Sequence, residues 1–268
     1  MKRLQHIILL IFLTVPLHSS AQVLNAPKPF MTKKIFKDFI NIHMDYPEQD
    51  IRKRNQGKFV LYFKTNDKGE VIQKNILQSV SSGIDSIGLD IFNKILWLPA
   101  DYSGVSGKGE SVFTLKFKIS KFEKLAKRRG YRHIDIPYRP VDKSYRIYKP
   151  KSLDKQPEAF TQPYKNIEEL IYSKLEYPED ALKQNISGTV KLSFIIEVNG
   201  LPSNIHVIDA VGGGCSDEAV SIIEGIKWRP GIKEGKAVRS LKIIKISFSI
   251  KNRNTPGYIP AQNRQGTI

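Results

Sequence analysis

Apolar and polar residues alternate in two long segments of the chain. In residues 189–198 every second side chain is apolar, and the predicted strand at residues 241–250 shows the same alternation from Ile244 onward. A period of two is typical of a strand with one face in a core and the other in solvent. Asn199-Gly200 follows the first segment and favours a tight hairpin turn, so we predict a returning strand at residues 203–210.

Apolar residues at helical spacing flank these strands. Ile167, Leu170 and Ile171 predict a helix before Tyr177-Pro178, and apolar positions in residues 219–226 predict another. We expect Ser216 to cap the second helix, whose first turn holds two acidic residues. The resulting order is helix, strand, strand, helix, strand.

The same order occurs twice. Tyr46-Pro47-Glu48 recurs as Tyr177-Pro178-Glu179, and this shift of 131 positions also superposes glycines, prolines and large aromatics without a gap. Glycine and proline fix backbone shape and aromatics dominate cores, so the repeated feature is a fold. We predict an α+β fold with two repeats of a small helix-strand-strand-helix-strand domain, each with a three-stranded antiparallel sheet packed by helices. The superposed pairs include Gly57/Gly188, Gly69/Gly200, Gly83/Gly214, Trp97/Trp228, Pro99/Pro230, Gly104/Gly235 and Phe117/Phe248.

These patterns divide the chain into five parts. Residues 1–21 form a signal peptide, 30–120 the first repeat, 121–163 a linker, 164–251 the second repeat and 252–268 a disordered tail. In the first repeat we expect a helix at about residues 86–97 and a last strand with Phe113, Leu115 and Phe117 inward. Gly88 replaces Ala219 there, at a cost of about 1 kcal/mol in helix propensity, so we expect the first repeat to be less stable.

The N-terminus has the pattern of an export signal. Lys2 and Arg3 precede an apolar run, and Ser19-Ser20-Ala21 provides small residues for cleavage before Gln22. The run is shorter than the roughly 20 residues that a membrane-spanning helix needs. We therefore predict an exported protein, with a retained inner-membrane anchor as the alternative.

The chain is strongly basic, with a formal net charge of +17. This charge favours anionic partners, which for an exported protein are envelope polymers or lipid headgroups and not nucleic acid. The linker has tyrosines among many cations, twelve Lys or Arg against five Asp or Glu in residues 121–159. It is either a solvated connection, which we favour, or a polymer-binding segment. The candidate polymer-binding residues are Lys127, Arg128, Arg129 and Arg132.

The sequence contains no recognisable catalytic or metal-binding motif. Cys215 is the only cysteine, which excludes an intramolecular disulfide. Its place before a helix fits either a nucleophile or a small apolar side chain at a tight turn, and no histidine stands at a motif-like spacing from it. The histidines show no metal-ligand spacing. We predict no enzyme activity, no metal and no cofactor.

Several short motifs in the second repeat occur in a family-specific order. Together they resemble the TonB C-terminal domain over residues 166–250, whereas the first repeat resembles it only through the internal duplication. The motifs are Tyr177-Pro178-Glu179-Asp180-Ala181, Gly188-Thr189-Val190, Asn199-Gly200, Asp217-Glu218-Ala219-Val220, Lys227-Trp228-Arg229-Pro230-Gly231, Gly235-Lys236 and Phe248.

The resemblance implies a periplasmic module that binds an extended peptide of an outer-membrane, TonB-dependent receptor or another envelope protein and supports transport. The peptide would lie along the last strand, and an open sheet edge can accept a strand on general grounds. The alternatives are an edge occupied within the chain or by a second copy in a homodimer. An energy transducer is implied only if the N-terminal segment stays in the inner membrane. The candidate partner-binding residues are Ser240, Leu241, Lys242, Ile243, Ile244, Lys245, Ile246, Ser247 and Phe248.

Overall fold

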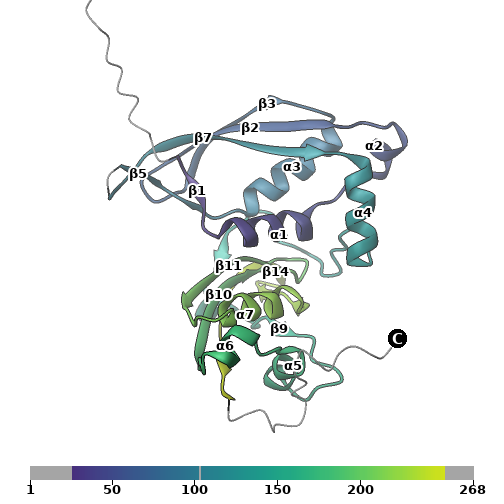
Figure 1. Cartoon of the computed structure of the whole chain (residues 1–268). Helices are drawn as coiled ribbons and strands as arrows, with labels where there is room; N and C mark the ends of the chain where they lie inside the picture. Colours follow the sequence, from purple (N-terminus) through teal and green to yellow (C-terminus); the bar gives the residue numbers. More distant parts are fainter. Residues whose placement is uncertain (1–25, 103, 251–268) are drawn as a thin grey trace, which may run out of the picture.

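The computed structural model describes residues 26–102 and 104–250. The predicted signal peptide and C-terminal tail lie outside the described residues. Two α+β units are stacked on one another, and helix α1 (Lys33–His43) lies between them (Figure 1). Within the described ranges, no helix has the length and apolar character needed to cross a membrane.

The first repeat is a three-stranded antiparallel sheet in the order β3-β2-β7. Helices α1 and α3 cover the face of the sheet that points to the second repeat (Figure 1). The aromatic side chains of Phe59, Phe63 and Phe92 form the centre of its core and are at most 1% exposed. The elements are β1 (Lys28–Pro29), α1, α2 (Glu48–Arg52), β2 (Gly57–Thr65), β3 (Val71–Gln78), α3 (Ser82–Lys94), β4 (Trp97–Leu98), β5 (Ala100–Tyr102), β6 (Val105–Gly107) and β7 (Gly109–Phe117).

The second repeat has the same central sheet in the order β11-β10-β14. It is larger than predicted, because the short strand β13 and a strand of the linker, β8, also pair with β14. The α+β fold is confirmed. The elements are α5 (Ile167–Lys174), α6 (Glu179–Lys183), β10 (Gly188–Ile196), β11 (Pro202–Asp209), α7 (Cys215–Glu224), β12 (Trp228–Arg229), β13 (Gly231–Lys233) and β14 (Lys236–Phe248).

One helix and several strands of the two repeats begin and end at equivalent residues, 131 positions apart. Adding 131 to the bounds of α2, β2, β3 and β4 gives those of α6, β10, β11 and β12. The repeated tyrosine has one role in both repeats, because the Tyr46 hydroxyl donates to the carbonyl of Asn55 and the Tyr177 hydroxyl donates to that of Ile186. Each bond ties the start of a short helix to the chain nine residues later.

Two helix starts differ from the prediction. Helix α3 begins at Ser82, four residues early, because the Ser81 hydroxyl accepts a hydrogen bond from the Ile84 amide. Helix α7 begins at Cys215 after Gly214, which has φ of 89°. Ser216 is not the cap that we expected, since its hydroxyl bonds the N–H and C=O of Val211 and closes the preceding loop.

The linker does not fit the expectation of a solvated segment. It contains α4 (Ile119–Arg129), β8 (Ile147–Tyr148), a 3-10 turn η1 (Pro150–Ser152) and β9 (Glu158–Ala159). Strand β9 pairs with β12 and β8 pairs with β14, so the linker follows the second repeat for much of its length.

The two repeats share a well-packed interface. Ile35 of α1 belongs to the core of the second repeat, and the Phe30 ring stacks on His206 with ring centroids 4.2 Å apart. His43 of α1 is 1% exposed, and burial lowers the pKa of its imidazole well below the usual value. The orientation of the second repeat is therefore set by side chains of the first.

Candidate functional site

Strand β14 is the longest strand of the described structure and carries the predicted binding residues. It starts from a tight hairpin with β13, in which Glu234 and Gly235 have φ of 50° and 71°, as a turn of this hand requires. From Ser240 to Phe248 it pairs with β10 in an unbroken register. One of its two edges is therefore fully used over the predicted site.

The two faces of β14 differ. Ile244, Ile246 and Phe248 point into the core of the second repeat, and the last two are 2% exposed. The side chain of Ile243 lies on the other face and is 48% exposed, and Lys245 is exposed as well. The alternation that predicted this strand is thus the alternation of core and surface.

The second edge of β14 is partly covered by the linker. Strand β8 pairs with Arg239 and Ser240 in parallel orientation, and Ala237 exchanges backbone hydrogen bonds with Pro140 and Asp142. The ammonium group of Lys242 lies 3.4 Å from the carbonyl of Pro157. The expectation of a fully open edge is therefore wrong at Ser240, because the linker already supplies a strand there.

The rest of this edge, which we call the outer edge of β14, runs from Ile243 to Phe248. Within the described residues no strand pairs with it. Ala237 directs its N–H and C=O toward the linker, and alternate residues of a strand point these groups to the same edge. The backbone groups of Ile243, Lys245 and Ser247 therefore face the outer edge.

Arg239 fixes the start of this site. Its guanidinium donates two hydrogen bonds to the carboxylate of Glu197, both of 2.8 Å, and further bonds of 2.8 Å to the carbonyls of Lys94 and Tyr145. Arg239 is 4% exposed and Glu197 is fully buried. One side chain thus joins β14, the first repeat and the linker, a role with no signal in the sequence.

The candidate polymer-binding residues do not act as one group. Lys127 and Arg128 are exposed at the end of α4. The Arg129 guanidinium donates to the carbonyls of Asn41 and Met44 in the first repeat, at 3.2 and 2.7 Å. Arg132 forms ion pairs with Glu48 and Glu123, at 2.7 and 2.9 Å. Arg129 and Arg132 hold α4 against the first repeat, so two of the four are used internally.

Cys215 is fully buried in the core of the second repeat, and burial raises the pKa of its thiol. This environment favours the packing role over the nucleophile. Among the described residues, no three His, Cys, Asp or Glu side chains lie close enough to hold a metal ion.

The comparison with known families agrees with this part of the structure. Residues 173–250 match the model for the Gram-negative bacterial TonB protein C-terminal family, so the second repeat is a TonB C-terminal domain. The match contains all of β14 and its partner β10. No curated protein matches the chain. Domains of this family are non-enzymatic protein-interaction modules of the periplasm and cell envelope, and they act in envelope transport.

Proposed function

We propose that the protein binds an extended segment of an outer-membrane receptor or another envelope protein on the outer edge of β14. The guest segment adds a strand to the sheet of the second repeat and hydrogen-bonds to Ile243, Lys245 and Ser247. Main-chain bonds supply affinity in this mode, and alternate side chains supply specificity. No covalent bond is made or broken in this binding, so the proposed role is that of an interaction module in the periplasm and not of an enzyme.

The linker strand carries the proposal. Strand β8 shows that the outer side of β14 accepts a parallel strand, and the sheet continues beyond it without a partner. The exposed apolar side chain of Ile243 lies directly at this unpaired stretch. Unpaired strand edges with exposed apolar residues are sites of strand addition.

The first repeat does not fall within the family match. Its own last strand, β7, pairs with β2 from Gly57 to Thr65 and has no other strand partner among the described residues. We propose that the first repeat is a degenerate copy of the domain. Its main role is to orient the second repeat through α1 and through the bonds that Arg239 makes.

Site-specific crosslinking in living cells tests this function. A photoreactive residue at position 245 is expected to crosslink to the extended segment of an outer-membrane receptor, because Lys245 is exposed at the outer edge. The control is position 191 on β10, which is paired on both sides by β11 and β14. Equal crosslinking from both positions, or none from position 245, contradicts the proposal.

A further inference from the structure

Strand β3 of the first repeat is a second exposed sheet edge, and it carries large apolar side chains. All eight of its residues are exposed, and the exposed fractions of Ile72 and Leu77 are 59% and 63%. It pairs with β2 on one side and has no strand partner on the other side within the described residues. Long apolar edge strands attract further strands, and natural proteins usually cover or charge them.

The equivalent edge of the second repeat is covered over its first half. Strand β11 lies 131 residues later, and its first four residues are buried beneath the first repeat. The Asn204 side chain donates to the carbonyl of Lys94 and accepts from the amide of Leu96, both at 2.8 Å. The interface between the repeats thus uses one of the two equivalent edges and leaves β3 open.

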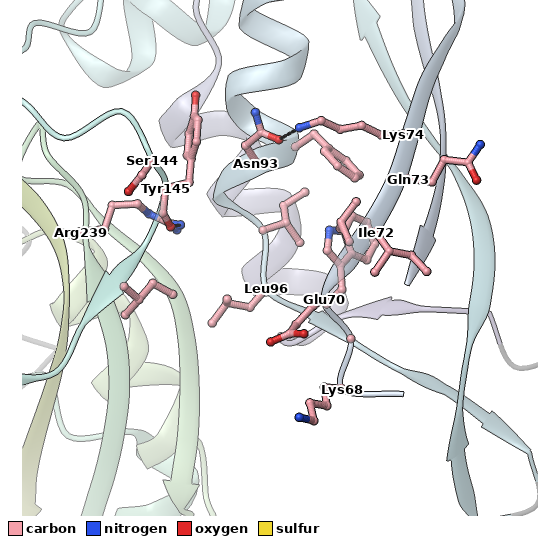
Figure 2. A pocket seen from close by; sticks show the side chains of 16 residues that line it. Lys68, Glu70, Ile72, Gln73, Lys74, Asn93, Leu96, Ser144, Tyr145 and Arg239 are labelled. Atoms are coloured by element: carbon pink, nitrogen blue, oxygen red, sulfur yellow. Dashed lines mark hydrogen bonds between the residues drawn. The ribbon is translucent and has the colours of Figure 1, made fainter. Parts of the chain in front are cut away.

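A groove lies beside β3. Figure 2 shows Lys68, Glu70 and Ile72 on one side of it and Tyr145 and Arg239 on the other. Its volume is 620 Å³, and its wall on the second side comes from the linker and the second repeat. The groove is lined by Val71 to Lys74 of β3 and not by residues 75–78, so a strand added to this first half of β3 would be enclosed by three parts of the chain.

The open edge selects an extended backbone as its occupant. Unpaired N–H and C=O groups of a strand are satisfied by another strand, whereas a helix has no backbone groups to offer. A second copy of β3 fits poorly. The antiparallel register that places both Ile72 and Ile76 against apolar partners also places Lys74 opposite Lys74, and like charges directly opposite destabilise a sheet.

The charge around the groove favours an acidic guest. Lys68 and Lys74 line it, and neither forms an ion pair with a carboxylate among the described residues. Lys74 donates to the amide oxygen of Asn93, which is a neutral partner. Arg239 is paired with Glu197, whereas Glu70 accepts from the neutral side-chain amide of Asn66 and keeps its charge. The two unpaired lysines therefore face one carboxylate, and the groove keeps a net charge of +1.

We propose that the groove along β3 binds an extended acidic peptide of a partner protein, which adds to β3 as a strand and places a carboxylate beside Lys68 or Lys74. This site is separate from the outer edge of β14, so its failure would leave the proposed function intact. If both sites are occupied by one partner, the fixed arrangement of the repeats makes the protein bivalent.

The test uses the full chain and two synthetic ten-residue peptides of alternating valine and threonine, one with a glutamate at each end and one with a lysine at each end. Binding is followed by fluorescence anisotropy and by hydrogen exchange of the β3 amides. We expect the acidic peptide to slow exchange in β3 and to bind about fivefold more tightly than the basic one, as two partly exposed ion pairs predict. The double variant Lys68→Glu/Lys74→Glu should reverse this preference.

Matched variants locate the binding. Ile72→Asn, which removes the apolar contact without adding a charge, is expected to abolish binding, whereas Val112→Asn, at a 51% exposed position on β7 of the same sheet, should leave it unchanged. Ile243→Pro on β14 should also leave it unchanged. Three results would overturn the proposal: no protection in β3, equal binding by the Ile72→Asn variant, or concentration-dependent self-association of the chain that Ile72→Asn removes.

Discussion

Arg239 and Glu197 form a bidentate ion pair that is almost fully withdrawn from solvent. The two hydrogen bonds are 2.8 Å long, and the exposed fractions of the two residues are 4% and 0%. The same guanidinium bonds the carbonyl of Lys94 in the first repeat. Since a buried charge is costly unless it is paired, this interaction depends on the first repeat, the linker and β14 being together.

The first prediction concerns this pair. Arg239→Met leaves the Glu197 carboxylate buried without its partner and should lower the free energy of unfolding by about 3 to 5 kcal/mol. The double variant Arg239→Met/Glu197→Leu should regain a large part of this loss, because no unpaired charge remains. Urea denaturation of both variants measures the difference, and equal losses in the single and double variants would refute the assignment.

The second prediction concerns two contacting core positions at which a large residue in one repeat is matched by a small one beside it. A Cβ atom added at Gly88 would lie 2.6 Å from the ring of Phe59, whereas the second repeat has Ala219 and Val190 at the equivalent positions. Gly88→Ala should therefore destabilise the protein by about 1 to 3 kcal/mol despite its better helix propensity.

The double variant Phe59→Val/Gly88→Ala provides the control for this pair. It copies the second repeat and should be more stable than the sum of the two single changes predicts, by at least about 0.5 kcal/mol, because contacting residues couple. Thermal and urea unfolding of the four proteins complete the cycle. If the changes in unfolding free energy of the two single variants add up exactly to that of the double variant, the Phe59 ring does not require glycine at position 88.

The third prediction concerns a carboxyl group at the interface of the repeats. Burial and the nearby Asp38 raise the pKa of Glu224 to about 7. A carboxyl with a raised pKa in the folded state stabilises it at low pH, and this contribution is lost as pH rises from about 4.5 through about 7.

Glu224→Gln removes this dependence. The variant should be more stable than the parent at pH 8 by about 1 kcal/mol, after allowance for solvent screening of a partly exposed group, and the difference should shrink at pH 5. Chemical denaturation at the two pH values measures it. Asp217→Asn, whose carboxylate pairs with Lys34 at 3.7 Å near the same interface, is the control and should not show this gain.

The sequence predicted the elements whose cause is local. The alternation of apolar residues located β10 and most of β14, and the shift of 131 located the first sheet. Helix α4 was missed although Phe122 and Ala126 stand at helical spacing before Gly130, a residue with φ of 78° that ends the helix. Here the basic composition obscured a periodicity that was present.

Other features have no local cause. Strand β8 is two residues long and exists only because β14 provides an edge, so no pattern in Ile147-Tyr148 could predict it. For the same reason, the sequence could not predict that the edge of β14 at Ser240 is already paired. In the same way Arg129 looks like one of several surface cations in the sequence, and only the position of α1 shows that its guanidinium is used inside the molecule.

The central claim is that a guest strand pairs with the outer edge of β14, and proline at position 243 tests it most directly. Ile243 directs its N–H to this edge, so Ile243→Pro removes a bond to the guest and not to β10. Ile243→Thr keeps the N–H and serves as the control. In a binding assay with a receptor segment captured by the position-245 crosslink, we predict that the proline variant, still folded, loses binding at least about tenfold while the threonine variant retains it, a difference of about 1.4 kcal/mol. Equal binding by the two folded variants would contradict the account.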